Sequence, residues 1–283
     1  MNFLRTILLL GILSGLMVAI GGYLGGRQGL IIAFIFAVLT NIASYWFSAP
    51  LALKMSGAQP VDRSEAPELY DIVESLAKSA SLPMPTIHII PTEAANAFAT
   101  GRDPQHAAVA VTQGIMRILN RNELTGVLAH ELGHVRNRDI LITTIAAVLA
   151  ATITMLAHFA QWGAYYGSSS DRQGNRNPIG LLLVIILAPF AAMLVQMAVS
   201  RTRELEADKT GAHIGHDPLE LANALRKVEA ASQVVPFREA NPALSSLYIV
   251  KPNPGDWYTN LFSTHPPTAE RIARLEAMAR HEV

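Results

Sequence analysis

Four long apolar stretches constrain this chain more than any other feature of its sequence. Leu4 to Leu24 and Leu30 to Phe47 each contain about 18 to 20 uncharged residues, enough at 1.5 Å per residue to cross a ~30 Å hydrocarbon layer. Ile140 to Trp162 and Ile179 to Val199 form a second pair, separated by the polar connector Tyr165 to Pro178. Each stretch exceeds the ~10 to 14 residues typical of a buried core helix, which is the alternative for any one of them. We therefore predict four membrane-spanning helices in two hairpins.

Composition supports a membrane protein and excludes several classes of function. The chain is 51% hydrophobic and 16% charged, which is too apolar for a typical soluble enzyme. Its net charge is zero and no run of like charges occurs, so nothing predicts a nucleic-acid partner. Cysteine is absent, which excludes disulfides, thiol nucleophiles and cysteine-based metal sites. Any metal must therefore be held by His, Asp or Glu.

Basic residues near the ends of the apolar stretches predict the orientation in the membrane. The side that carries more of them should be cytoplasmic, and it holds the N-terminus and both long polar segments. The first stretch is too long for a signal peptide and lacks a cleavage site, so we expect it to be retained. The basic residues on the richer side are Arg5, Lys54, Arg63, Arg121, Arg136, Arg138, Arg201, Arg203 and Lys209, against Arg27, Arg172 and Arg176 on the other.

These boundaries divide the chain into four parts. Residues 1–48 form the first transmembrane hairpin and residues 140–199 the second, while residues 49–139 and 200–283 together form one cytoplasmic domain. The expected fold is a mainly helical α+β integral membrane protein. We expect a multi-pass membrane protein, so the lipid bilayer is its first partner. The sequence sets no oligomeric state.

Short periodic segments predict the elements of the polar domain. Pro67 to Ala80 has apolar residues at helical spacing, and the β-branched run Thr86 to Ile90 is typical of a strand. Ala107 to Thr112 alternates as a second strand, followed by a short helix near Ile115 to Leu119. Asn122 can cap the next helix. A small β-sheet with helices around it is expected.

The helix that begins near Asn122 contains the segment His130-Glu131-Leu132-Gly133-His134. A spacing of four residues puts both imidazoles on one face of the helix, as two corners of a zinc tetrahedron require. Glu131 lies about 100° around the helix from His130, so it can act on a water molecule at the metal without replacing a ligand. Because this pattern also occurs by chance, other features of the chain must show whether the segment binds a metal.

The two predicted hairpins indicate a third ligand. His134 precedes the third stretch by about six residues and Glu204 follows the fourth by about five, so both stand roughly 8 Å above the bilayer surface. Antiparallel packing of the two helices would bring them together. Asp208, one turn beyond Glu204 on the same face, can orient an imidazole. The alternative is that both acids pair with Arg201 and Arg203 on a solvated helix.

The remaining histidines are weaker candidates. His213 lies nine residues beyond Glu204 on the opposite side of its helix, and a third His six residues after His134 is excluded because position 140 is Ile. His158 lies inside a predicted span, too far along the helix to reach the metal. His216 lies near the helix that carries Glu204, but no other feature favours it as a ligand. No motif surrounds three further histidines, namely His88, His106 and His281.

Four motifs in order resemble the M48 metallopeptidases over nearly the whole chain. They are Asn96-Ala97-Phe98-Ala99, His130 to His134, Glu204 to Asp208, and His265-Pro266-Pro267 with Arg271, interleaved with the four apolar stretches. The resemblance implies a zincin-like (gluzincin) domain in which one zinc ion is bound by His130, His134 and Glu204, with Glu131 as catalytic base. It also implies a catalytic role for His265, substrate contacts for Asn96, Ala97 and Phe98, and supporting roles for Asp208 and Arg271.

The resemblance implies a zinc-dependent metalloendopeptidase of the bacterial cytoplasmic (inner) membrane. It would cleave misfolded or damaged membrane proteins at their cytoplasmic side, as part of a stress response. The substrate could add to an exposed edge strand in extended form. A processing peptidase for prenylated C-termini is the alternative, although the relatives of that kind have more spans. An intramembrane protease would place its motif within an apolar stretch, and here Arg136, Arg138 and Asp139 intervene. A non-catalytic scaffold would have lost Glu131 or a ligand.

Overall fold

The computed structural model describes residues 2–149, 201–235, 247–249 and 266–280. Most of the third apolar stretch, the connector Tyr165 to Pro178 and the fourth stretch lie outside the described residues, as do His158, His265 and His281. Within the described part the protein is mainly helical, with one small mixed sheet.

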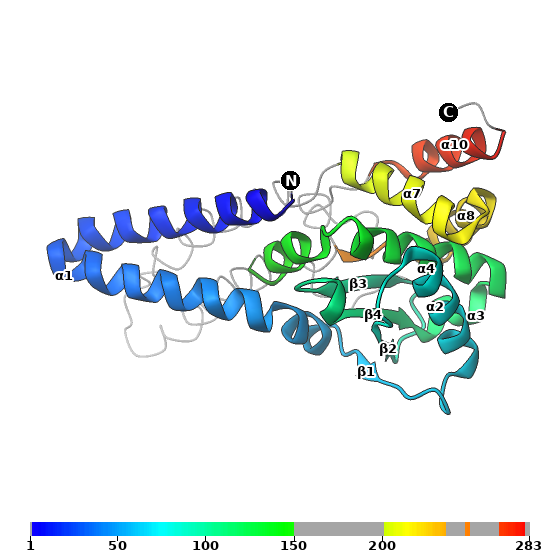
Figure 1. Cartoon of the computed structure of the whole chain (residues 1–283), viewed down its shortest axis with the longest axis horizontal. Coiled ribbons are helices and arrows are strands. Elements are labelled where there is room, and N and C mark those ends of the chain that lie inside the picture. The colour runs from blue at the N-terminus through cyan, green and yellow to red at the C-terminus, as the bar shows by residue number, and fades with distance from the viewer. Residues whose placement is uncertain (1, 150–200, 236–246, 250–265, 281–283) are drawn as a thin grey trace, which may run out of the picture.

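Helix α1, Asn2–Met55, is the longest element, and it doubles back at Gly26 (Figure 1). Gly26 has φ 56° and ψ −142°, a backbone conformation that glycine adopts far more readily than other residues. The amide Nδ2 of Asn41 donates a hydrogen bond of 2.8 Å to Ser14 Oγ across the two halves. The first two apolar stretches are thus the arms of one helical hairpin, and the second arm continues past Phe47 to Met55.

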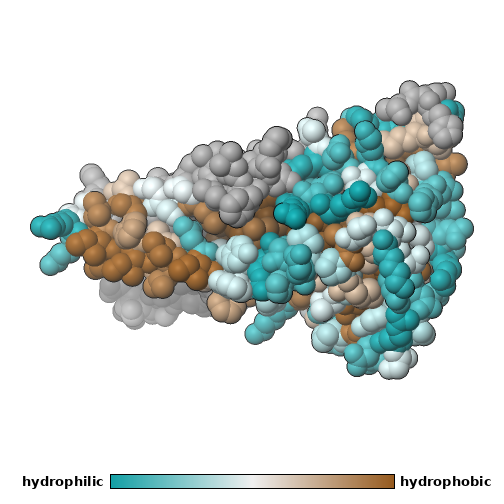
Figure 2. Space-filling view, viewed as in Figure 1, coloured by the Kyte–Doolittle hydropathy of each residue, from teal (hydrophilic) through white to brown (hydrophobic). Residues whose placement is uncertain are grey.

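The second arm of α1 exposes a continuous apolar surface, visible as a brown band in Figure 2. Gly26–Met55 is the one helix among the described residues that is long and apolar enough to cross a membrane, and only 6% of its most apolar window is buried. A patch of this extent is unfavourable in water and favourable in lipid. Its largest exposed side chains include Ile32, Phe34, Phe36, Leu39, Trp46 and Phe47.

The sheet has four strands in the order β1-β2-β4-β3. The strands are β1 Gln59–Pro60, β2 Thr86–Ile90, β3 Ala97–Gly101 and β4 Ala107–Thr112, so both predicted strands are confirmed with their predicted bounds. Strand β2 pairs parallel with β4, while β1 and β3 pair antiparallel with their neighbours. Strand β3 is therefore an edge strand. It is also wholly buried, because other elements cover it.

Helices α2, Pro67–Ala80, and α3, Gln113–Ile118, agree with the prediction, apart from a shift of one or two residues in α3. Helix α4, Arg121–Arg136, is capped by Asn120 and not by Asn122 as predicted. The side chain of Asn120 accepts a hydrogen bond from the backbone N–H of Glu123, and the Glu123 carboxylate accepts one from the N–H of Asn120. This reciprocal capping box satisfies two backbone donors, which explains why the earlier asparagine begins the helix.

Helix α4 is the centre of the hydrophobic core. It packs against α2 and β3 and, from the C-terminal segments, against α7, Arg201–Gly215, and α8, Pro218–Val234. Helix α10, Thr268–Ala279, lies against α8 and α7, as Figure 1 shows. The core residues of α4 are Leu124, Val127, Leu128, Ala129, Leu132 and Val135. The two polar segments, distant in sequence, therefore share one core.

A second hydrophobic cluster joins the α1 hairpin to the sheet. Ala52 of α1 packs with Phe98 of β3, with Val148 of the apolar helix Ile140–Leu149, and with Tyr248. The guanidinium of Arg102 lies 4.4 Å from the ring centroid of Trp46, a cation–π contact at the end of the exposed apolar band. Helix α1 is thus held against the sheet rather than attached by a free linker.

The corrected cap gives a direct test. Replacing Asn120 with Ala removes the side-chain acceptor that caps the N–H of Glu123, while the backbone N–H that donates to the Glu123 carboxylate remains. The change should cost about 1 kcal/mol and lower the unfolding temperature by a few degrees. Asn122→Ala is the matched control, because the exposed Asn122 makes one long side-chain hydrogen bond, of 3.4 Å to Glu220, and should cost under about 0.5 kcal/mol. Thermal unfolding in detergent would measure both; an equal or larger loss for Asn122→Ala would contradict the assignment.

Candidate metal centre and active site

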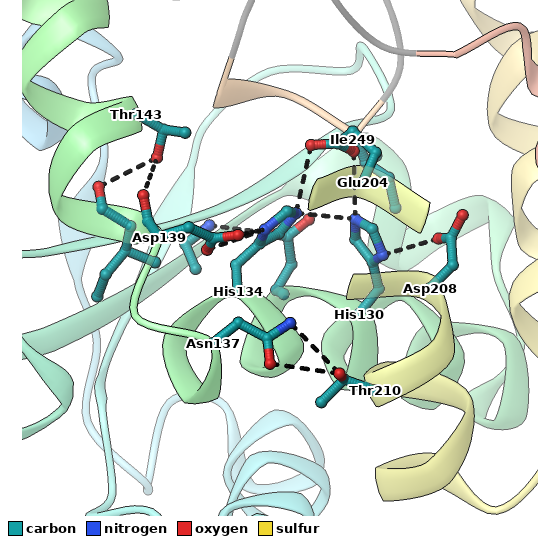
Figure 3. A network of polar contacts seen from close by, with 12 residues as sticks. His130, His134, Asn137, Asp139, Thr143, Glu204, Asp208, Thr210 and Ile249 are labelled. Atoms are coloured by element: carbon teal, nitrogen blue, oxygen red, sulfur yellow. Dashed lines mark hydrogen bonds and ion pairs between the residues drawn. The ribbon is translucent and has the colours of Figure 1, made fainter. Parts of the chain in front are cut away.

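The two histidines of α4 point toward one another from adjacent turns (Figure 3). His130 Nε2 and His134 Nε2 are 3.2 Å apart, and the ring planes are nearly perpendicular at 85°. His130 is 1% exposed. Two imidazole nitrogens at this separation must share either a proton or a cation.

Glu204 on α7 completes the cluster, as the apolar stretches predicted. Its Oε1 lies 3.6 Å from His134 Nε2 and its Oε2 lies 3.8 Å from His130 Nε2. One ligand atom from each of the three residues lies within 4.8 Å of the others. Glu204 itself is 3% exposed, so the sequence alternative of a solvated α7 face does not describe this side of the helix.

Two glycines let α4 and α7 approach closely enough for this contact. A Cβ at Gly211 would lie 2.8 Å from the backbone N and Cα of His130, and a Cβ at Gly133 would lie 2.9 Å from the carbonyl oxygen of Ala207. Any larger side chain at either position would force the backbones apart. The glycines therefore set the distance between the histidines and Glu204.

Each imidazole is oriented by an acid through its other nitrogen. His130 Nδ1 lies 2.9 Å from Asp208 Oδ1, and His134 Nδ1 lies 3.1 Å from both carboxylate oxygens of Asp139. Arg138, with φ 57°, ends the turn after α4 and reverses the chain so that Asp139 faces His134. With both Nδ1–H groups donating to carboxylates, both Nε2 atoms face the gap beside Glu204.

Arg271 on α10 is the largest fully buried side chain of the described residues, and it supports Asp208. Its Nε and Nη2 donate to the two carboxylate oxygens of Asp208 at 3.0 and 2.7 Å, a bidentate pair. Its Nη2 also lies 3.4 Å from the ring nitrogens of His130. Arg271 thus connects the C-terminal helix to the histidine through one carboxylate.

The donor set fits a tetrahedral divalent metal. With metal–nitrogen distances of about 2.0 to 2.1 Å, two ligands of a tetrahedron stand roughly 3.3 Å apart. The His130 and His134 nitrogens are 3.2 Å apart and Glu204 lies slightly farther from both. Three protein ligands leave one position open, as in catalytic rather than structural sites.

Glu131 occupies the wall between the cluster and the sheet. It is 3% exposed, and its Oε2 accepts a hydrogen bond of 2.8 Å from the backbone N–H of Ala99 on β3. Burial raises the pKa of the Glu131 carboxyl to about 8. A carboxylate fixed by an edge strand beside a metal site has the position and the proton affinity of a general base.

The histidine pKa values shift in opposite directions without a metal. Burial and the Arg271 guanidinium lower the pKa of His130 to about 4. Burial also lowers the pKa of His134, but Asp139 and Glu204 outweigh it and raise that pKa to about 10. One positive charge on His134 thus balances the acids around it, a role that a divalent cation between the rings would take over.

The structure places the other predicted residues as follows. The side chain of Asn96 accepts a hydrogen bond from the N–H of Ala97, while the ring of Phe98 is buried against Tyr248 with 5.5 Å between centroids. The exposed residues His213 and His216 lie outside the cluster. His265 is among the residues that the structure leaves undescribed.

Sequence reasoning missed three contributors. In the sequence, Asp139 is only a polar residue before a predicted span, and nothing in its spacing from His134 marks it as an orienting partner. The N–H of Ala99 and the buried residue Ile249, whose carbonyl oxygen accepts from Arg271 Nη1 at 3.2 Å, act through backbone atoms. Backbone contacts of this kind leave no side-chain pattern to read.

Asp139 gives the sharpest test of the orienting acids. Asp139→Asn keeps the size of the side chain but removes the charge that His134 Nδ1–H faces, so zinc affinity should fall about 10- to 100-fold. Asp103→Asn, a change at an acid whose hydrogen bonds are to the exposed His106, should leave the affinity unchanged. Competition against a fluorescent chelator would measure the zinc affinity of both variants. An affinity of Asp139→Asn equal to that of the wild type would show that Asp139 does not orient His134.

Comparison with known proteins agrees with this geometry. Residues 63–279 match the model of Peptidase family M48. The chain is 51% identical over 277 residues to the Protease HtpX homolog of Syntrophobacter fumaroxidans, covering 97% of this chain and 98% of that relative. It is 52% identical over 283 residues to the homolog of the same name from Persephonella marina, covering 99% and 98% of the two chains.

Among solved structures, the crystal structure of S. mikatae Ste24p matches 97% of this chain with a TM-score of 0.50 and 19% sequence identity. This chain spans 65% of the length of Ste24p, and the likeness concerns the fold alone. The family match covers most of the chain and includes the histidine cluster, Asp208 and Arg271. The chain therefore belongs to peptidase family M48 and is a membrane-associated metalloprotease.

Proposed function

We propose that this protein is a zinc-dependent endopeptidase that hydrolyses peptide bonds of misfolded or damaged membrane proteins at the cytoplasmic face of the membrane. One observation carries the proposal: the buried carboxylate of Glu131 lies between a three-residue metal cluster and the edge strand β3. Base, metal ligands and a backbone edge are the three parts that peptide hydrolysis needs in one place.

Zinc is the metal that this donor set favours. Two imidazoles and one carboxylate around an open fourth position are typical of catalytic zinc in peptidases, and the chain has no cysteine to offer a softer ligand. We assign one zinc per chain to His130, His134 and Glu204. When bound, the zinc would supply a Lewis acid next to Glu131.

Glu131 is the proposed general base and then general acid. Its carboxylate accepts a proton from the attacking water and returns it to the leaving amine. The hydrogen bond from Ala99 N–H holds one carboxylate oxygen in place, so the other is free to turn toward the water. Burial of Glu131 raises the pKa of its carboxyl, which favours taking up a proton from water.

The outer edge of β3 is the proposed substrate platform. The N–H of Ala99 donates to Glu131 and the N–H of Ala97 donates to the Asn96 side chain, so both groups lie on the edge of β3 that faces away from β4. A substrate in extended form can add there through main-chain hydrogen bonds, with Asn96 helping to set the position of Ala97. Such binding tolerates many sequences, which suits unfolded substrates.

Supporting roles follow from the contacts. Asp208 holds His130 in the tautomer that presents Nε2 to the metal, and Arg271 holds Asp208. Phe98 supports the strand from its inner face, through its contact with Tyr248. We assign to His265, three residues before α10, the stabilisation of the oxyanion that forms on the substrate carbonyl.

For the membrane we propose four spans, with the N-terminus and the catalytic domain cytoplasmic. The exposed apolar arm of α1 and the apolar helix Ile140–Leu149, which begins directly after the metal site, support this arrangement. The catalytic domain is then built from residues 49–139 and 200–283 around the hairpins of residues 1–48 and 140–199. A site at the bilayer surface can reach membrane proteins whose cytoplasmic segments have unfolded.

The catalytic role of Glu131 is tested by Glu131→Gln, which keeps the shape and the hydrogen bond from Ala99 but cannot take a proton. Purified wild-type protein with about one zinc per chain should cleave casein, while Glu131→Gln should retain its zinc and lose at least about 100-fold in rate. Glu206→Gln, an exposed change on α7, is the matched control and should stay active. Undiminished cleavage by Glu131→Gln would exclude this mechanism.

The topology is testable because the chain has no natural cysteine. Single cysteines at Gln28, beside the turn of α1, and at Ser64, in the catalytic domain, are both on exposed positions. In intact cells a membrane-impermeant maleimide should label Gln28→Cys and should spare Ser64→Cys until the cells are opened. Labelling of Ser64→Cys from outside would reverse the proposed orientation.

A further inference from the structure

Three residues, Leu247–Tyr248–Ile249, lie against β3 at the proposed substrate platform, although they are remote from β3 in sequence. All three are buried: Tyr248 is 1% exposed and Ile249 is 2% exposed. Figure 3 draws Ile249 beside Glu204, above the two imidazole rings. We call Leu247–Ile249 the strap.

The backbone of Ile249 is held on both sides by groups of the site. Its N–H donates a hydrogen bond of 3.2 Å to the carbonyl oxygen of Ala97 on β3. Its carbonyl oxygen accepts one of 3.2 Å from Arg271 Nη1, the same guanidinium that pairs with Asp208 and lies against His130. Ile249 thus bridges the edge strand and the metal centre through main-chain atoms alone.

The edge that Ile249 uses is the one where the proposed substrate would bind. Along the outer edge of β3, the Ala99 N–H holds the base Glu131, and the Ala97 carbonyl is the preceding group on the same edge. An extended peptide aligned on this edge beside Glu131 would direct an N–H at the Ala97 carbonyl. Ile249 already supplies that N–H, and its buried backbone leaves no space for a second chain.

Side-chain packing anchors the strap. Ile249 belongs to the main hydrophobic core, while Tyr248 meets the ring of Phe98 edge to face, at 5.5 Å and 89°. An aromatic pair of this geometry adds to the gain from burial alone. The strap is therefore a specific contact and not a chance approach of two segments.

We infer that the strap occupies the substrate platform of its own chain. Ile249 takes the place of one substrate residue between the Ala97 carbonyl and Arg271. A substrate must displace Ile249 before it can be cleaved. The inference rests on the proposed peptidase function. The protein would then be held in a low-affinity state, because only the fraction of molecules with the strap released can bind substrate. The place that Ile249 fills would accept a branched aliphatic residue of the substrate.

Substitution at Ile249 tests the competition. Ile249→Pro lacks the N–H that bonds to Ala97, so the strap should be released more often, and KM for an internally quenched peptide cleaved by the wild type should fall about fivefold with kcat unchanged. Ile249→Val keeps the N–H and the β-branch and should leave KM near the wild-type value. If the strap only supported the substrate platform and did not compete with substrate, Ile249→Pro at full zinc content would leave KM unchanged or raise it. That result would show the inference to be wrong.

A second measurement leaves the strap intact, so it holds even if Ile249→Pro fails to fold. In Glu131→Gln, saturation with the same peptide should speed the amide hydrogen exchange of the segment that contains residues 247–249, because the bound peptide expels it. Unchanged or slower exchange would overturn the inference. A wild-type protein that cleaves no peptide would instead count against the proposed function, which separates the two failures.

Discussion

The close contact between α4 and α7 is the interaction on which the site depends. Two helices that belong to segments far apart in sequence touch backbone to backbone, because Gly133 and Gly211 present no side chain at the crossing. This contact brings Glu204 within 4 Å of both histidine rings. The apolar helix Ile140–Leu149 begins four residues after α4 ends. The metal cluster therefore lies directly beside the start of an apolar helix.

Charge explains why the cluster needs a cation. Among the described residues of the site, four buried carboxyl groups, those of Glu131, Asp139, Glu204 and Asp208, face one buried guanidinium, that of Arg271. Buried acids without a compensating charge are costly, and a divalent ion among them would reduce that cost. Arg271 balances Asp208 in a bidentate pair, whereas His134 carries the remaining compensation when no metal is bound. Metal binding and the stability of this core are consequently linked.

The sequence predicted those parts of the structure that have a short-range signature. The strands Thr86–Ile90 and Ala107–Thr112 and the helix Pro67–Ala80 follow from periodicity and agree with the structure residue for residue. Spacing alone placed His130 beside His134, and the position of Glu204 relative to an apolar stretch brought it to them.

Other features depend on contacts that only the folded chain makes. Asn120 rather than Asn122 caps α4 because its partner Glu123 stands at the third position of the helix, and either asparagine fits the residue preferences of a cap. Asp139 reaches His134 through a positive φ at Arg138, and Ile249 bonds to Ala97 and to Arg271 through its backbone atoms. None of these leaves a periodic pattern, so residue types could not reveal them.

The central claim, that His130, His134 and Glu204 hold the metal, is tested most directly by X-ray absorption at the zinc edge of the purified protein. The account predicts four nitrogen or oxygen donors at about 2.0 to 2.2 Å, with the multiple-scattering signature of two imidazoles. In Glu204→Gln the zinc content should fall while two imidazoles remain around any zinc that is bound. A wild-type spectrum that requires three imidazoles would place another histidine in the coordination sphere and would contradict the ligand set.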